Sequence, residues 1–324
     1  MSESPWLPLP KQPRFVQLAD VSPADLRAEL ADGLAAEAAS IAPKYFYDAL
    51  GSRLFDAITD LPEYYPTRTE AGILAARRWD IAEAVGRART LIDLGAGNCE
   101  KASRLFSTLA PARYVAVDIS VEFLRRALAA LQREHPELDL VGLGQDFSRA
   151  LRLPAEVGDG PRTFFYPGSS IGNFTPEDAC AFLCRVRAGS PGCNLVIGVD
   201  LVKDQAVLEA AYDDPLGVTA AFNRNVLLHV NRLLGSDFAL ADWRHVALFN
   251  AAESRIEMHL EARRAVDVRW PGGGRRFAAG ERIHSENSYK YGVETFGRLL
   301  RQAGYAQTHC WTDERGWFAV FCAS

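Results

Sequence analysis

The sequence predicts an α/β fold in which a largely parallel sheet, covered by helices on both faces, carries an inserted α+β domain. Between residues 90 and 202, apolar strand patterns alternate with helical patterns, and such alternation builds a parallel sheet. Residues 90–101, TLIDLGAGNCEK, read as a buried strand, a sharp Gly-x-Gly turn and the start of a helix. After residue 202 the alternation stops and antiparallel strand patterns begin, which indicates an insertion.

Each element is expected from its local pattern. Parallel strands are expected at residues 90–94, 113–118, 138–143, 162–167 and 194–201. Helices are expected at residues 23–38, 53–61, 67–85, 100–109, 120–134, 175–188, 203–212, 219–234 and 293–303. Antiparallel strands are expected at residues 244–250, 255–265, 276–291, 307–311 and 316–322. We therefore predict a sheet domain of residues 66–202 plus 289–324 and a substrate domain of residues 1–65 plus 203–288.

Length and composition exclude several classes of protein. The 324 residues are 48% hydrophobic and 24% charged, which is ordinary for a globular protein with a full core. The net charge is −5, and no run of Lys and Arg is long enough to indicate nucleic-acid binding. No stretch approaches the ~20 apolar residues that span a membrane, and the Pro-rich N-terminus lacks a signal-peptide core. The cysteines and histidines lack metal-ligand spacing. We expect a cytoplasmic monomer without metal, nucleic acid or membrane partners.

The Gly-x-Gly turn is suited to a nucleoside ligand. A Cβ at Gly95 or Gly97 would keep such a ligand away from the backbone. The dinucleotide fingerprint requires a third glycine where Glu100 stands, and a carboxylate there would repel a pyrophosphate. S-adenosylmethionine (SAM) fits better, because it carries a sulfonium cation and no phosphate.

Three acids support this choice, each near the end of a successive strand: Asp93, Asp118 and Asp146. We expect Asp118 to accept hydrogen bonds from ribose hydroxyls. We expect Asp146 to accept one from the adenine amino group while Phe147 packs on the ring. For a single acid, capping of the following helix is an equal alternative, but three successive acids favour ligand binding.

Aromatic and polar residues elsewhere suit a small polar substrate. Residues 44–70 are dense in aromatics beside prolines, including Tyr47, Tyr64 and Tyr65. Such rings either fill a core or line a pocket, where the hydroxyl supplies a hydrogen bond. Asn173 follows the fourth strand and could contact the substrate, or could simply occupy a turn with positive φ.

The segment Glu286-Asn287-Ser288 presents a possible ring-binding pair. In a strand, Glu286 and Ser288 point to the same face. A carboxylate and a hydroxyl together suit an imidazole, because its two nitrogens can each be paired. From spacing alone, the simpler interpretation is an exposed cross-strand pair with Lys or Arg.

Several blocks of the chain carry a family resemblance. They are KYFYDALGSRLFDAITDLPEYYPTRTE, IDLGAGNCEK, GSSIGNF, YDDPLGVTAAFNRNVL, RIEMHL and SENSYKY, in order from about residue 40 to the end. Together they resemble the histidine-specific Nα-methyltransferases of ergothioneine biosynthesis. The resemblance implies a Rossmann-like sheet of the SAM-dependent methyltransferase type, with SAM as cofactor and L-histidine as small-molecule substrate. One departure from methyltransferases at large is Cys99, which stands where a third glycine is common.

The resemblance also implies roles for individual residues. Contacts with SAM are implied for Tyr47, Gly95, Lys101, Asp118, Asp146 and Phe147. Contacts with histidine are implied for Tyr64, Gly168, Asn173, Tyr212, Met258, Glu286, Asn287 and Ser288. Within these sets, Tyr47 lies where SAM and substrate meet, and Glu286 with Ser288 grips the imidazole. The catalytic candidates are Tyr47 and Asn173, because either could orient the lone pair of the attacking amine.

The implied reaction is three successive methyl transfers to the α-amino nitrogen of histidine, giving the betaine trimethylhistidine (hercynine) and S-adenosylhomocysteine. Two alternatives remain at this point. The same chemistry could act on another free amino acid such as tryptophan or tyrosine, or the chain could bind SAM without catalysis. Met258 together with Glu286 disfavours an indole, which offers a single donor. The crowded tyrosines and Asn173 favour an enzyme.

Overall fold

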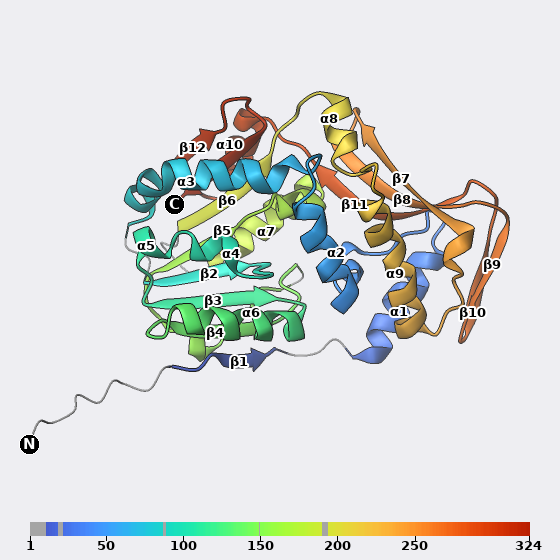
Figure 1. The fold of residues 1–324 in the computed structure, drawn as a ribbon, viewed down its shortest axis with the longest axis horizontal. Helices are drawn as coiled ribbons and strands as arrows, with labels where there is room; N and C mark the ends of the chain where they lie inside the picture. The colour runs from blue at the N-terminus through green and yellow to red at the C-terminus, as the bar shows by residue number, and fades with distance from the viewer. Residues whose placement is uncertain (1–10, 19–21, 87–88, 149, 190–193) are drawn as a thin grey trace, which may run out of the picture.

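The computed structural model describes residues 11–18, 22–86, 89–148, 150–189 and 194–324. Within these residues the central feature is an eight-stranded sheet with the order β1-β4-β3-β2-β5-β6-β13-β12 (Figure 1). Its strands are β1 (Arg14–Gln17), β2 (Thr90–Leu94), β3 (Arg113–Asp118), β4 (Asp139–Gly144), β5 (Arg162–Tyr166), β6 (Asn194–Asp200), β12 (Thr308–Thr312) and β13 (Phe318–Ala323). Strand β13 pairs antiparallel with β6 and with β12, and the other pairs are parallel. The predicted α/β class with a largely parallel sheet is confirmed.

Helices cover both faces of this sheet and bury its apolar side chains. The helices on one face are α7 (Pro176–Ala188) and α10 (Val293–Gln302). The helices on the other face are α3 (Tyr65–Val85), α4 (Glu100–Ser103), α5 (Phe106–Leu109) and α6 (Val121–Glu134). Because the strands are buried on both faces, their sequences are nearly continuous apolar runs, as is usual for parallel sheets.

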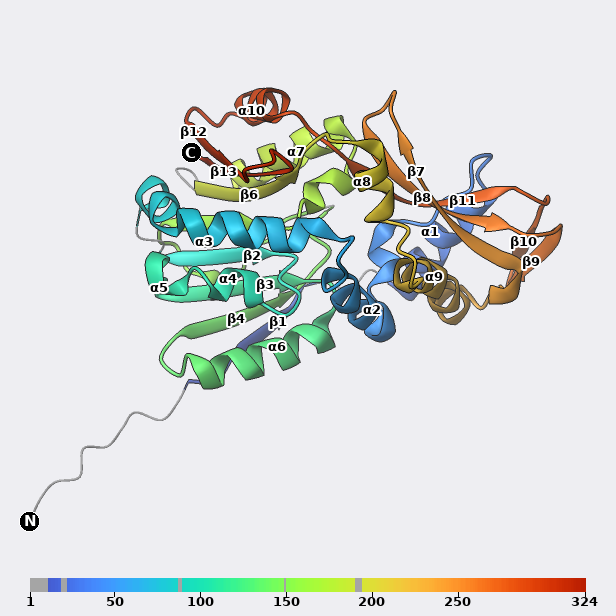
Figure 2. The same cartoon turned by 45° about the horizontal axis from the view of Figure 1, so that its top comes forward.

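The inserted elements and the helices of residues 23–59 form a second body, which lies beyond the carboxyl ends of the central strands (Figures 1 and 2). Its strands are β7 (Trp243–Asn250), β8 (Arg255–Ala262) and β11 (Arg282–Tyr289), with the hairpin β9 (Val266–Trp270) and β10 (Gly273–Phe277). Its helices are α1 (Pro23–Ala35), η1 (Pro43–Phe46), α2 (Ala49–Thr59), α8 (Gln205–Ala210), α9 (Val218–Leu234) and η4 (Leu240–Asp242). We call this body the lid.

The lid has an apolar core of its own, which runs from Leu30 to Ile283 and is separate from the two clusters that cover the sheet. This separation supports a division into a SAM-binding domain, residues 66–202 plus 289–324, and a substrate domain, residues 1–65 plus 203–288. We keep these boundaries as a proposal. Two short helices, η2 (Ala155–Val157) and η3 (Ser170–Asn173), complete the described elements.

The structure differs from the sequence prediction at several elements. Strand β1 was not predicted; it pairs with β4, where Gly142 and Gly144 leave room for the side chains of Phe15 and Gln17. The helix expected at residues 100–109 is two short helices, α4 and α5. The strand expected at residues 276–291 is divided between β10 and β11, and β9 was missed. The first helix ends at Ala35 rather than residue 38.

Among the described residues, no helix has the length and apolar character that a membrane span requires. In the same part of the chain, no three His, Cys, Asp or Glu side chains gather into a possible metal site.

Candidate active site

The Gly-x-Gly turn after β2 forms the first part of the site. Gly95 and Gly97 have φ angles of +72° and +52°, in the region that favours glycine. A Cβ built at Gly95 would lie 3.8 Å from Cζ of Phe147, so the turn lies close to the ring of Phe147, in the loop after β4. Gly97 N donates a hydrogen bond to Asp118 Oδ2 at 3.0 Å, which ties the turn to the end of β3. The structure therefore brings Gly95, Asp118 and Phe147 together at one edge of the sheet.

Asp118 keeps acceptor capacity for a ligand. Its second oxygen, Oδ1, accepts from Ser120 N at 2.8 Å. Burial raises the pKa of the Asp118 carboxyl, while the backbone hydrogen bonds from Ser120 and Gly97 lower it. The backbone of Ile119 is a third donor to this carboxyl. A carboxylate has about four lone-pair sites, so acceptor capacity remains for a ribose hydroxyl.

The carboxylate of Asp146 has one oxygen without a hydrogen-bond donor among the described residues, and this oxygen shows whether the edge fits SAM. Its Oδ1 accepts from Ser148 N at 3.1 Å. Its Oδ2 is buried and accepts no hydrogen bond from a described residue, although Lys44 Nζ lies 3.5 Å away as an ion-pair contact. A buried acceptor without a donor needs an explanation in a folded protein. An adenine amino group would satisfy it, so the residues present fit an adenosyl ligand.

Asp93 lies directly before the turn, and its Oδ1 is buried and accepts no hydrogen bond from a described residue. Its side chain is buried in the sheet, where Tyr114 Oη of β3 donates to Asp93 Oδ2 at 2.6 Å. Burial raises the pKa of Asp93 to about 7, and the hydrogen bond from Tyr114 opposes this rise. We interpret Asp93 as support for the strand pair beneath the turn.

A buried glutamate links the predicted SAM residue Lys101 to Gly168. Glu70 is 1% exposed; Lys101 Nζ donates to its Oε2 at 2.8 Å, and Gly168 N donates to its Oε1 at 2.8 Å. Sequence reasoning did not single out Glu70. The sequence did indicate that Glu70 is buried. Glu70 lies three and four residues before Ile73 and Leu74 and so occupies the apolar face of α3.

The lid supplies the predicted ring-binding pair. Glu286 and Met258 are direct cross-strand partners of β11 and β8, so their side chains share a face. Ser288 follows on the same face and its Oγ lies 2.7 Å from Tyr212 Oη. Burial raises the pKa of Glu286 to about 8, and the nearby Lys290 lowers it. Among the described residues, no side chain donates a hydrogen bond to this carboxylate. A buried carboxylate, two hydroxyls and a thioether therefore line one face of the lid.

Tyr47 stands between the two parts of the site. Its carbonyl oxygen accepts from Ser120 Oγ at 2.8 Å, at the end of β3. Burial raises the pKa of the Tyr47 hydroxyl far above its ordinary value, and charges on Glu286, Tyr64 and Asp118 raise it further. The Tyr47 ring packs edge-on against Phe222 of α9, with 5.9 Å between ring centroids, so Tyr47 contacts both the lid and the end of β3.

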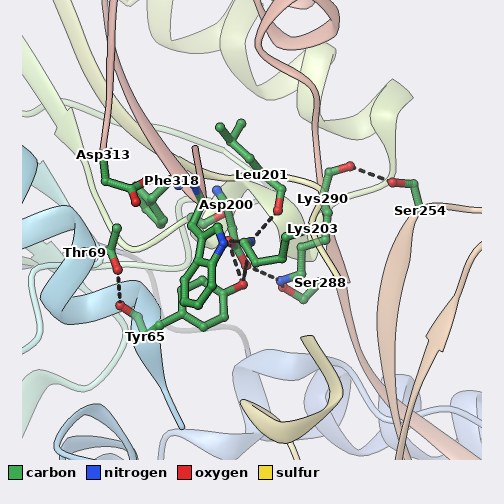
Figure 3. A network of polar contacts seen from close by, with 12 residues as sticks. Tyr65, Thr69, Asp200, Leu201, Lys203, Ser254, Ser288, Lys290, Asp313 and Phe318 are labelled. Atoms are coloured by element: carbon green, nitrogen blue, oxygen red, sulfur yellow. Dashed lines mark hydrogen bonds and ion pairs between the residues drawn. The ribbon is translucent and has the colours of Figure 1, made fainter. Parts of the chain in front are cut away.

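The side chains of the neighbouring residues Tyr64 and Tyr65 lie in different surroundings. The ring of Tyr64 packs edge-on against Tyr212 with 6.2 Å between ring centroids. Tyr65 Oη instead donates to the carboxylate of Asp200, at 2.9 and 2.8 Å from its two oxygens (Figure 3). Tyr64 is thus the one that packs beside Tyr212, whose hydroxyl contacts Ser288, and its contact with histidine stays a prediction.

The two predicted asparagines differ. Asn173 ends η3, and Gly172 beside it packs on β11 so closely that a Cβ would lie 2.8 Å from Tyr289 O. Gly168 and Ser169 take the positive φ angles in this turn and Asn173 does not, so the turn interpretation of Asn173 is wrong. Asn287 lies on the opposite face of β11 from Glu286, where its Oδ1 is 2.9 Å from His284 Nε2. We therefore leave the Asn287 side chain out of the proposed substrate contacts.

Two surface grooves lie apart from these residues. One, of about 500 Å³, runs between α1 and α9, and the other, of about 560 Å³, between α3 and the β12–β13 turn. Neither groove is lined by Asp118, Asp146 or Glu286. We place the site by its convergent polar groups rather than by open volume, because such groups determine orientation and chemistry.

The sheet with its antiparallel last strand, the Gly-x-Gly turn and the acids beside it define a SAM-dependent methyltransferase. Comparison with known proteins narrows this class. Residues 26–324 match the model of a family described as "Histidine-specific methyltransferase, SAM-dependent", and the chain belongs to this family.

Three relatives are informative. A histidine N-alpha-methyltransferase of Mycolicibacterium smegmatis is 45% identical over 94% of this chain and 96% of its own length. The enzyme of the same name from Mycobacterium tuberculosis is 43% identical over 92% of this chain and 94% of its own length. The ergothioneine biosynthesis protein 1 of Neurospora crassa is 32% identical over 82% of this chain but only 31% of its own length.

Proposed function

We propose that this protein transfers three methyl groups from SAM to the α-amino nitrogen of L-histidine, giving hercynine in the first step of ergothioneine biosynthesis. The observation that carries the proposal is the buried lid face of Glu286, Met258 and Ser288, found in the same chain as a Gly-x-Gly turn tied to Asp118. The names of the three relatives support the same substrate and pathway.

The proposed cofactor contacts are those of the edge described above: Tyr47, Gly95, Lys101, Asp118, Asp146 and Phe147. When bound there, SAM would supply a methyl group activated by its sulfonium. The histidine amine would take this methyl group, with S-adenosylhomocysteine as the leaving group. Tyr47 and Asn173 are proposed to orient the lone pair of that amine. The raised pKa keeps the Tyr47 phenol protonated near neutral pH, so it orients the amine and water takes the released proton. Alignment of this kind can lower a barrier by up to about 7–11 kcal/mol.

The proposed substrate contacts are Tyr64, Gly168, Asn173, Tyr212, Met258, Glu286 and Ser288. Glu286 and the Ser288 hydroxyl pair the two ring nitrogens, and Met258 contacts the ring from the neighbouring strand. A ring with a single polar atom would leave one of the two groups unpaired, and buried unpaired groups are costly. This set therefore favours imidazole over indole or phenol.

The experiment that tests the proposal is incubation of the protein with isotope-labelled SAM and each of the twenty amino acids, followed by mass measurement of the products. We expect mono-, di- and trimethylated histidine and no methylation of tryptophan or tyrosine. Label on another amino acid would establish the alternative substrate, and absence of label on all twenty would favour SAM binding without catalysis.

Replacement of Asp118 by Ala is expected to weaken SAM binding by about 10- to 100-fold, the range for lost hydrogen bonds to a charged group. Titration calorimetry with SAM measures this loss. The matched control is Asp139→Ala, which alters an acid held by Arg14 and Arg113 at the start of β4, at the opposite end of the strands. Equal losses in the two variants would mean that Asp118 acts only on the fold.

The affinity for histidine is expected to rise with pH up to about 8, because Glu286 must lose its proton before it can accept from an imidazole N–H. Below that pH the affinity should fall by about tenfold per pH unit, because Glu286 must then release one proton when histidine binds. The measurement is histidine binding in the presence of S-adenosylhomocysteine. Glu286→Gln should lack this slope, while titration of the substrate amine affects both proteins equally.

A monomeric state, a cytoplasmic location and the absence of nucleic-acid or membrane partners are further proposals. Mass measurement in solution and cell fractionation would test them.

A further inference from the structure

A buried lysine lies directly behind the two lid hydroxyls. Lys290 follows β11, and its side chain is 0% exposed (Figure 3). Its Nζ donates to Ser288 Oγ at 2.8 Å and to Tyr212 Oη at 3.1 Å. The third partner is Asp200, the last residue of β6, whose Oδ2 lies 2.7 Å away. An ammonium group has three N–H donors and no acceptor, so these partners use all of them.

The donor-only character of Lys290 fixes the direction of the other hydrogen bonds. Both hydroxyls must accept from Lys290. The Tyr212 and Ser288 oxygens lie 2.7 Å apart, so one of them donates to the other. One hydroxyl hydrogen then remains, and it has no partner within this group. The pair therefore keeps one O–H hydrogen that needs an acceptor, and one lone pair remains on the oxygen of the other hydroxyl.

The position of Glu286 completes the arrangement. Glu286, Ser288 and Lys290 alternate along the chain and so point to the same side of it. An ionised Glu286 only accepts hydrogen bonds. A ring held between the carboxylate and the hydroxyl pair satisfies both groups when it offers one N–H to Glu286 and one bare nitrogen to the free O–H. A neutral imidazole does this, whereas an imidazolium, with two N–H groups, would leave the buried O–H without an acceptor.

Building on the proposed function, we propose that Lys290 is a positioning residue that sets the hydrogen-bond direction of the Tyr212–Ser288 pair and thereby selects the neutral form of the substrate ring. Lys290 does not touch the substrate in this account. It acts through the two hydroxyls, and Asp200 holds it in place from the end of β6.

The same network contains a matched control. Lys203 also pairs with Asp200, with Nζ 2.6 Å from Oδ1, and its side chain is 3% exposed. Its further contacts are Tyr65 Oη, at 2.7 Å, and the carbonyl of Leu201. Lys203 thus neutralises the same carboxylate from within the same buried network without touching Ser288 or Tyr212. If Lys290 had only a structural role, replacing either lysine should change the KM for histidine to the same extent.

The experiment compares Lys290→Met with Lys203→Met. Steady-state kinetics with histidine and SAM should show the KM for histidine raised about 10- to 100-fold in Lys290→Met, as expected for lost hydrogen bonds to a charged group. The KM for SAM should stay within about twofold. Lys203→Met should keep both KM values within about twofold while losing a similar amount of thermal stability. Equal effects of the two substitutions on the KM for histidine would overturn the proposal.

A second measurement uses the unaltered protein and so does not depend on whether a variant folds. Nitrogen NMR of ¹⁵N-labelled histidine, bound together with S-adenosylhomocysteine, reports whether each ring nitrogen carries a proton. We expect one protonated and one bare nitrogen; two protonated nitrogens would overturn the proposal. If the unaltered protein methylates no histidine at all, the proposed function itself fails, which is distinguishable from either result.

Discussion

Replacement of Glu286 by Ala is expected to lower kcat/KM for histidine by about 10³- to 10⁴-fold, because a site built on hydrogen bonds discriminates strongly when one partner is missing. The carboxylate lies beside Met258 and Ser288 on the lid and has no other hydrogen-bond donor among the described side chains. Without it, one imidazole nitrogen stays unpaired in a buried site. The dissociation constant for SAM should change by less than about twofold, because the SAM edge is formed by the sheet.

Calorimetry with SAM and steady-state kinetics with histidine measure the two effects separately. The substitution should not unfold the protein, since burial raises the pKa of Glu286 to about 8 and its charge therefore costs stability in the folded state. Thermal unfolding at pH 8 or above should show an Ala variant at least as stable as the unaltered protein. Loss of SAM affinity with retained histidine turnover would contradict the assignment of Glu286.

The sheet could be predicted from the sequence almost residue by residue. Strands β2 and β3 have the predicted bounds, and β4, β5 and β6 differ by one residue at their ends. The reason is physical: strands buried on both faces are short apolar runs, and helices between them make each boundary visible. Strand β1 has only four residues with exposed ends, so its apolar pattern is too short to detect; its position depends on the glycines of β4.

The site could be predicted in part. Its acids and glycines follow strands, so their convergence at one edge follows from the fold class. The groups that hold them in place could not be found this way. Glu70 contacts Lys101 and Gly168, and Lys290 contacts Asp200 and Tyr212, over separations in sequence that no local pattern encodes. Lys290 did carry a signal, because a lysine two residues after Ser288 lies on the same strand face.

Replacement of Asp200 by Ala is expected to lower the free energy of unfolding by about 3–5 kcal/mol, the cost of leaving a buried charge without its partner. Burial alone would raise the pKa of Asp200, but the charges of Lys290 and Lys203 outweigh it and hold this pKa below its ordinary value of 3.8. The pKa of Lys203 is lowered by burial to about 8 in spite of Asp200. Both pKa values are lowered, which favours the charged form of Asp200 and disfavours the charged form of Lys203. This agrees with one carboxylate that is paired with two cations, since Lys203 does not have the carboxylate to itself.

The pH dependence and a matched variant test this account. A lowered pKa in the folded state means that the contribution of Asp200 is present above pH 3.8 and is lost as the pH falls further. Urea unfolding should therefore show the full difference near neutral pH and a smaller one in acid. Asp139 also pairs with two cations, Arg14 and Arg113, but its side chain is 24% exposed. Asp139→Ala should cost no more than about 1 kcal/mol, as solvent-screened pairs do. Similar losses in both variants would show that burial does not govern the strength of the Asp200 network.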